Sequence, residues 1–141
     1  MTSTTTGTER DTAAIADRIR AAYAAMARGD VEPLRQLMTD DVTYVDVSGG
    51  ITGGVHRGWD SILHLWTQAS QVAGGPVRLT LEDVVVPDEK RAVVFIRASA
   101  DIDGRTVEDA SVFVYYLEDG RVRTAYLMHE DPAAPEAFAD R

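Results

Sequence analysis

Asp46 and His129 are the two side chains of this sequence whose types and positions best suit proton transfer. Asp46 lies in the segment VTYVDV, where a carboxylate among apolar and β-branched residues costs free energy unless it is partnered or useful. If Val42 and Tyr44 share its face of a strand, that face is partly apolar, and a desolvated carboxylate can act as a general acid or base near neutral pH. The alternative is an aspartate that caps the glycine-rich loop that follows.

His129 and Tyr23 are the candidates for a partner group. Strand alternation puts His129 on the same face as Leu127, so it becomes a proton shuttle or a substrate hydrogen-bond donor if that face lines a pocket. Otherwise it is a solvated histidine at a strand end. Tyr23 lies on an apolar helical stripe, where its hydroxyl either donates to a substrate oxygen or belongs to an ordinary core tyrosine.

Apolar and aromatic side chains are available to line a cavity around these groups. As substrate-binding residues we predict Tyr44, Trp59, Trp66, Phe95, Tyr116, Val112, Leu127 and, near the pocket mouth, His56. Plain core packing is the alternative for each aromatic residue at these spacings. The predicted ligand is therefore a hydrophobic small molecule.

Several other chemistries lack their signatures in this chain. There is no cysteine, the three histidines have no paired metal-binding spacing, and no GxSxG elbow or dinucleotide fingerprint is present, so we expect neither a metal nor a cofactor. The glycine-rich residues 48–54 lack the lysine of a phosphate-binding loop and are interpreted as a flexible rim. A net charge of −9 argues against nucleic acid and anionic membranes as partners. With no long apolar run and no signal peptide, we expect a cytoplasmic protein.

The elements that must position these residues follow from periodicity. An apolar stripe at Ile15, Ile19, Tyr23 and Met26 predicts a helix that begins near residues 9–12 and ends at Gly29. A second helix carries Pro33 in its first turn, residues 42–47 form a strand, and a third helix follows Gly58. Four further strands are predicted at 77–86, 92–102, 106–117 and 122–130.

Turn and bulge signals connect these strands. Asp103-Gly104 and Asp119-Gly120 are hairpin turns, and a switch in apolar parity predicts a β-bulge at Glu82-Asp83. The order of elements predicts an α+β fold, in which a curved, mostly antiparallel sheet wraps around a long N-terminal helix with two further helices. We expect a disordered tail at 1–8, one domain at 9–131, and a C-terminal tail at 132–141.

Three segments carry a resemblance to a known family. They are AAYAAMARGDVEPLRQLMTDDVTYVDV, HRGWDSI and YYLEDGRVRTAYLMHED, residues 21–47, 56–62 and 115–131. With the element order, they make the chain similar to the nuclear transport factor 2-like superfamily, in its SnoaL-like, ketosteroid isomerase-like branch. The resemblance implies a cone-shaped sheet that encloses a pocket with the long helix, and a homodimer through the outer sheet face.

The resemblance also implies roles for individual positions. In ketosteroid isomerases of this fold the general-base aspartate lies near the end of the first strand, where this chain has Asp46. The helix tyrosine of those enzymes falls on Ala22, one residue before Tyr23, and their buried acid falls on Val112. A pocket tryptophan of some isomerases falls on His129. The chain thus keeps the base and departs from the isomerases at the groups that stabilise the oxyanion.

Two classes of function remain open at this point. The first is a cofactor-free cyclase or isomerase that acts on a polyketide-like molecule by aldol closure, double-bond shift, polyene cyclisation or epoxide opening, with epoxide hydrolase and dehydratase as further possibilities. Such a pocket can also promote cyclisation mainly by holding the substrate folded. The second is a non-catalytic module that binds a small molecule or serves for dimerisation.

Overall fold

The computed structural model describes residues 7–47 and 53–131 as one α+β unit. The C-terminal tail predicted at 132–141 lies outside these residues. So do residues 1–6 of the predicted N-terminal tail, whose last two residues begin the first helix, and residues 48–52 of the predicted glycine-rich rim. The elements in chain order are α1 (Gly7–Ala27), α2 (Glu32–Leu37), β1 (Met38–Asp46), β2 (Gly54–Arg57), α3 (Trp59–Ala73), β3 (Arg78–Asp88), β4 (Arg91–Ile102), β5 (Arg105–Glu118) and β6 (Arg121–His129).

The three predicted helices are present. Helix α1 buries Ile15, Ile19 and Tyr23 as the stripe predicts, and it begins at Gly7, slightly before the expected start. Gly29 follows α1 with a φ of 85°, a conformation that favours glycine. Asp30 accepts a hydrogen bond from the backbone N–H of Glu32 at 3.1 Å, which holds the start of α2.

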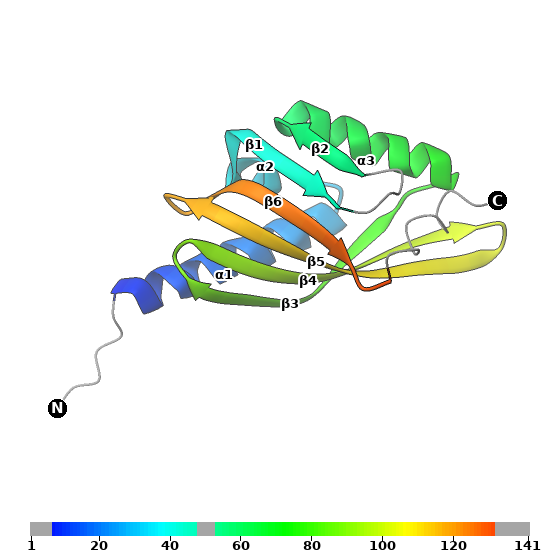
Figure 1. Ribbon diagram of the computed structural model, residues 1–141. Helices are drawn as coiled ribbons and strands as arrows, with labels where there is room; N and C mark the ends of the chain where they lie inside the picture. The colour runs from blue at the N-terminus through cyan, green and yellow to red at the C-terminus, as the bar shows by residue number, and fades with distance from the viewer. Residues whose placement is uncertain (1–6, 48–52, 132–141) are drawn as a thin grey trace.

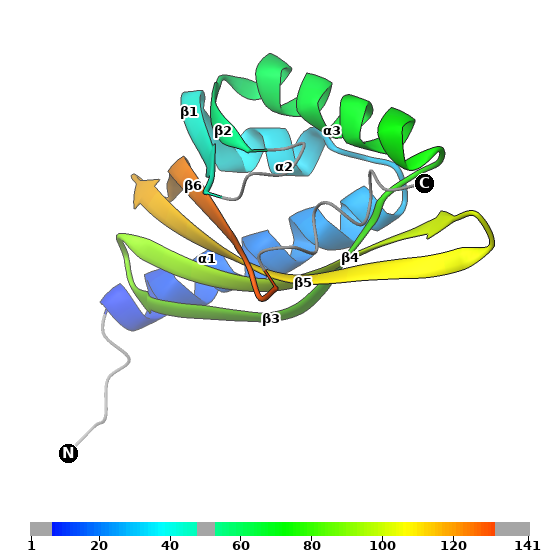
Figure 2. The same ribbon diagram turned by 45° about the vertical axis from the view of Figure 1, so that its right-hand side comes forward.

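The sheet has six strands in the order β2-β1-β6-β5-β4-β3. The four strands β3 to β6 form an antiparallel meander, as predicted. Strand β1 joins it by running parallel to β6, and the short strand β2, which sequence reasoning missed, pairs with β1 at the edge. Figures 1 and 2 show the sheet bending around α1, with α3 beside the β1–β2 edge. This is the curved, mixed α+β sheet that the element order predicts.

Local signals in the meander also match the structure. Asp103-Gly104 and Asp119-Gly120 all have positive φ, as a two-residue hairpin turn that matches strand twist requires. The register of β3 against β4 shifts between Leu81 and Asp83, where the bulge was predicted. Such a bulge bends the strand and contributes to the curvature of the sheet.

The core lies between the concave sheet face and the helices. Alternate residues of β5 are buried, from Asp109 through Ser111 and Phe113 to Tyr115, and they pack with the apolar stripe of α1. A second, smaller cluster joins the end of α3 to the β4–β5 hairpin around Ala73, Ala100 and Ile102. Within the described ranges, no helix has both the length and the apolar character needed to cross a membrane.

Candidate active site

The parallel pairing of β1 and β6 brings their carboxyl ends together, with Asp46 and His129 at those ends. Asp46 lies opposite Leu127 in the register and shares the buried face of β1 with Val42 and Tyr44. Nε2 of His129 is 3.2 Å from Oδ1 of Asp46 and 3.3 Å from Oδ2. The two candidates that the sequence singled out for proton transfer therefore touch each other.

Strand β5 completes this cluster from the other side of the imidazole. Nδ1 of His129 is 2.5 Å from Oδ2 of Asp109 and 3.2 Å from Oγ of Ser111. The Ser111 hydroxyl donates to the same Asp109 oxygen at 3.1 Å. We call Asp46, His129, Asp109 and Ser111 the Asp–His–Asp cluster. Its three ionisable side chains are 5% exposed or less, so its charges are removed from bulk water.

The two carboxylates determine the protonation state of His129. Burial by itself lowers the pKa of an imidazole, but the hydrogen bonds that the ring donates to Asp109 and Asp46 outweigh burial and raise the pKa of His129 from 6.5 to about 9. His129 is therefore an imidazolium at neutral pH, with one N–H directed at each carboxylate. With both carboxylates ionised, the cluster carries one net negative charge.

Tyr23 lies elsewhere on the concave face, paired with a second phenol. Its hydroxyl is 2.7 Å from that of Tyr115, and both side chains are buried. Burial raises the pKa of both phenols, so both stay neutral, and one hydroxyl donates to the other. Tyr115 is aligned with Ala125 of β6, two residues before Leu127, the partner of Asp46. Tyr115 thus lies in the row of side chains beside that of Asp46, and Tyr23 reaches it from α1.

Phe113, which sequence reasoning did not identify, packs against both Tyr44 and Tyr115. Its ring centroid lies 5.7 Å from that of Tyr44 and 5.4 Å from that of Tyr115. Phe113 pairs with Leu127 in the register, so both lie in the row of Asp46. The wall between the Asp–His–Asp cluster and the phenol pair is therefore apolar.

The other predicted lining residues divide between the two sheet faces. Tyr44 and Leu127 are buried on the concave face, and Trp59 and Trp66 of α3 are half-buried with their rings edge to face at 5.8 Å. Burial raises the pKa of Tyr44 further than its hydrogen bond with Trp66 lowers it. His56 of β2 is half-buried, its Nε2 lies 3.2 Å from the Gly53 carbonyl oxygen, and its ring centroid lies 6.0 Å from that of Tyr44. Because the Gly53 group is a carbonyl oxygen, Nε2 of His56 is the donor in that contact.

Three expected lining residues require correction. Phe95 and Tyr116 are 38% and 44% exposed, and Val112 is half-buried, because all three alternate with the buried residues of their strands. They project from the convex face, away from Asp46. The sequence alone does not show which face of these strands is the inner one, because residues 93–96 and 112–117 are largely apolar on both faces.

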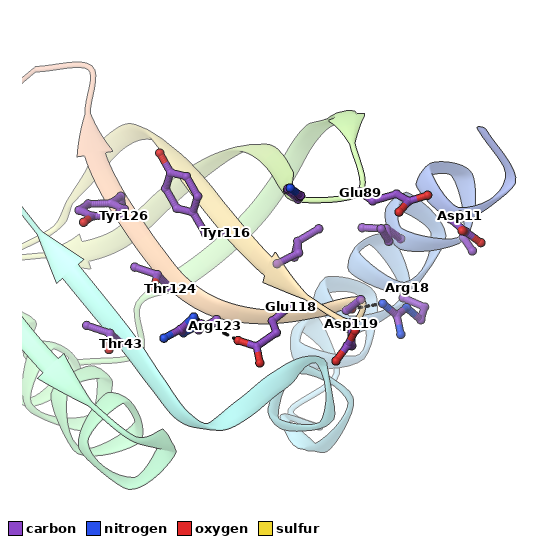
Figure 3. A pocket seen from close by; sticks show the side chains of 15 residues that line it. Asp11, Arg18, Thr43, Glu89, Tyr116, Glu118, Asp119, Arg123, Thr124 and Tyr126 are labelled. Atoms are coloured by element: carbon purple, nitrogen blue, oxygen red, sulfur yellow. Dashed lines mark hydrogen bonds and ion pairs between the residues drawn. The ribbon is translucent and has the colours of Figure 1, made fainter. Parts of the chain in front are cut away.

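A separate open groove lies where the start of α1 meets the β3–β4 and β5–β6 turns (Figure 3). It has a volume of about 1260 Å³ and contains Tyr116 and Tyr126 together with charged side chains of both signs, among them Arg18, Glu89 and Arg123. Arg123 is already paired with Glu118 at 3.3 Å. None of the four residues of the Asp–His–Asp cluster lines this groove, so it is not the candidate active site.

Asp109 and Ser111 are the functional candidates that the sequence did not identify. The signal that would have found them is parity, because both share a face with Phe113 and Tyr115. A carboxylate on the inward face of a strand needs a partner. In the part of the chain that the structure describes, no group of three or more side chains is arranged to hold a metal ion, and the two carboxylates of the cluster lie on opposite ring nitrogens of His129.

The curved sheet and its long helix form the fold of the solved nuclear transport factor 2-like proteins, among them one from Burkholderia xenovorans that is 23% identical with a TM-score of 0.69. The SnoaL-like domain family matches residues 19–125, and the chain belongs to this family, which includes cyclases and isomerases. An uncharacterized protein of Mycobacterium tuberculosis is 29% identical over 122 residues, 86% of this chain and 93% of that protein.

Solved structures share the fold. Bal32a, from a soil-derived mobile gene cassette, is 22% identical with a TM-score of 0.81 over 92% of this chain and 99% of its own. TerC, co-crystallized with polyporic acid, is 24% identical with a TM-score of 0.75 over 89% of this chain and 98% of its own.

Proposed function

We propose that this protein is a cofactor-free cyclase or isomerase that moves a proton on a hydrophobic, polyketide-like small molecule. The observation that carries the proposal is the buried contact between the Asp46 carboxylate and Nε2 of His129 on the concave face. A buried carboxylate next to an imidazolium can take a proton from carbon or oxygen, and the charged ring can return one. Membership of a family that includes cyclases and isomerases supports this reading.

The apolar surroundings support the same substrate class. Phe113, Leu127 and Tyr44 lie beside Asp46 on the concave face, and the Trp59–Trp66 pair of α3 packs against the same core. Such walls hold an apolar ring system and keep water from the reacting carbon. Tyr23 and Tyr115 share a single hydrogen bond between two hydroxyls, so one O–H proton of the pair remains available for a substrate oxygen. We propose that this proton polarises a carbonyl or stabilises an enolate.

A binding module of the same fold is the second candidate. The observation that favours it is that both ring nitrogens of His129 already have carboxylate partners, as in a purely structural ion-pair network. In that case the cluster holds the ends of β1, β5 and β6 together, and the apolar walls bind a ligand without changing it.

We further propose that the protein is a homodimer through the convex sheet face. Four large apolar side chains on that face are 38–44% exposed: Phe95, Tyr116, Tyr126 and Met128. The rings of Tyr116 and Tyr126 pack edge to face at 5.7 Å, which makes a continuous aromatic surface on neighbouring strands. Burying such a surface against a second copy removes it from water.

The acid/base reading is tested with 5-nitrobenzisoxazole, a neutral aromatic probe whose ring opens when a base removes its C3 proton. The electron pair forms a nitrile as the N–O bond breaks, and a coloured phenolate is released. We expect Asp46→Asn to lower the rate by about 100-fold or more, because general-base catalysis contributes that much. His64→Gln, on the exposed side of α3, is the control and keeps the wild-type rate.

Equal rates for the wild-type protein and Asp46→Asn would contradict the acid/base form. The shape-template form, or the binding module, would then be the better account. Circular dichroism of each variant shows whether it is folded, so that a loss of rate can be distinguished from a loss of structure.

A further inference from the structure

Asp109 is a buried charge that the proposed proton transfer does not use. Its side chain is 5% exposed, and only one of its carboxylate oxygens has partners, namely His129 and Ser111. The other oxygen, Oδ1, is buried without a hydrogen-bond partner in the residues that the structure describes. A carboxylate so placed is costly unless a positive charge compensates it, and the group in contact that can supply one is His129.

With both carboxylates ionised, the contacts of His129 leave one assignment of the ring protons. An ionised carboxylate only accepts hydrogen bonds, so Nδ1 must donate to Asp109 and Nε2 must donate to Asp46. Ser111 uses its own proton on Oδ2 of Asp109, and its oxygen faces Nδ1 at 3.2 Å. Every described polar group around the ring therefore favours the doubly protonated form.

We propose that Asp109, assisted by Ser111, is a positioning residue that holds His129 as an imidazolium, so that Asp46 is the base of the site and His129 its charged partner. This inference rests on the proposed function for the roles of Asp46 and His129. In this arrangement Asp109 maintains the protonation state of the ring, which neither Asp46 nor His129 can do alone. Without Asp109 the ring could lose the Nδ1 proton and become neutral while still donating to Asp46.

The consequence for Asp46 is electrostatic. A positive charge 3.2 Å from the Asp46 carboxylate interacts favourably with its ionised form, which is the form that accepts a proton. Among the residues that the structure describes, the groups in contact with the His129 ring are Asp46 on β1 and Asp109 and Ser111 on β5, and the neutral phenol of Tyr44 interacts with Asp46. None of them opposes the imidazolium.

The raised pKa of His129 agrees with this assignment. The direct test measures the protonation of the His129 ring as a function of pH, by ¹⁵N NMR of the full chain with ¹⁵N-labelled histidine. With only three histidines, His129→Gln identifies the signal. In the wild-type protein we expect both ring nitrogens to be protonated through neutral pH, with a titration midpoint near 9.

Three variants in the cluster and one control separate the contributions. Asp109→Asn should lower the midpoint by at least about one pH unit, because a hydrogen-bonded charge partner of a histidine contributes on that scale. It should leave the remaining ring proton on Nε2, facing Asp46. Ser111→Ala should lower the midpoint by less, and Asp109→Glu should restore it in part. Asp101→Asn removes an exposed carboxylate from the same β4–β5 hairpin and should leave the midpoint unchanged.

A second measurement is the pH dependence of the rate at which the ring of 5-nitrobenzisoxazole opens. A change at a residue with a purely structural role would not shift this pH dependence. In Asp109→Asn the part of that pH profile that follows deprotonation of His129, on the alkaline side, should shift to lower pH together with the NMR midpoint, because Asp46 loses its charged neighbour at lower pH than in the wild-type protein. A wild-type midpoint near 6.5, or one that Asp109→Asn does not lower, overturns the proposal. The wild-type titration decides this even if Asp109→Asn fails to fold.

The two proposals fail separately. If the NMR titration follows expectation but the ring-opening rate does not depend on Asp46, the proposed function fails, and Asp109 acts only on the protonation of His129. If Asp46 is needed for the rate but His129 titrates near 6.5, the proposed function stands and the role of Asp109 is refuted.

Discussion

Asp46 and His129 are 83 positions apart in the sequence, yet both oxygens of the carboxylate lie within 3.3 Å of Nε2 of the imidazole. The contact exists because β1 runs parallel to β6 and both strands end at the same edge of the sheet. Neither group touches bulk water to a significant extent. Their interaction is therefore stronger than that of a surface pair, and its effects should be measurable.

The first prediction concerns stability as a function of pH. The folded pKa of His129, about 9, lies above its unfolded value of 6.5, so protonation stabilises the fold fully below pH 6.5 and less as the pH rises through 9. We expect the free energy of unfolding to fall by about 2 to 3 kcal/mol between about pH 6 and about pH 10. Urea unfolding at several pH values measures it.

His129→Gln is the control for this prediction. It should flatten the dependence over the same range and leave only the contributions of the other titrating groups. If the variant and the wild-type protein lose stability in parallel, His129 is not the group responsible.

The second prediction concerns the Tyr23–Tyr115 hydrogen bond. Tyr23→Phe or Tyr115→Phe each removes one hydroxyl and leaves the other buried without its partner, which should lower the free energy of unfolding by about 1 kcal/mol or somewhat more. The double variant should cost clearly less than the sum, since both single changes remove the same bond. Urea unfolding of the four proteins completes the cycle, and strictly additive costs would show that the two hydroxyls do not interact.

The third prediction concerns the convex face. We expect the wild-type protein to be a dimer by light scattering, and Tyr126→Arg to be a monomer, because the guanidinium would be placed in the centre of the buried aromatic surface. Leu63→Arg is the matched control, since Leu63 is also 38% exposed but lies on α3. A monomeric wild-type protein, or a dimer that Tyr126→Arg leaves intact, contradicts the proposed interface.

Most of the fold could be predicted from local patterns. The apolar stripe of α1, the two Asp-Gly turns and the bulge near Asp83 each act over a few residues, so they are legible without knowledge of the rest of the chain. The strand Gly54–Arg57 could not be, since it is short, has no buried apolar residue, and forms only because β1 offers an edge to pair with.

Part of the candidate site was also within reach of the sequence. Asp46 stands out because a carboxylate among apolar, strand-forming residues needs a partner or a function. His129 stands out because strand alternation places it on the same face as Leu127. The lining residues were harder to assign. In residues 112–117 either face could be the inner one, so the pattern alone does not show that Phe113, and not Val112 or Tyr116, shares the buried face with Ser111.

The sequence by itself determined the class of fold, the turns, and the identity of the two groups at the ends of β1 and β6, because propensity, periodicity and turn chemistry are local properties. Only the tertiary structure decided that β1 lies beside β6, that Asp109 and Ser111 of β5 reach the other side of the imidazole, and that Tyr23 pairs with Tyr115. Those contacts depend on strand order and register. The protonation state of His129 follows from them, because it is determined by two carboxylates that the sequence places 63 residues apart, at positions 46 and 109.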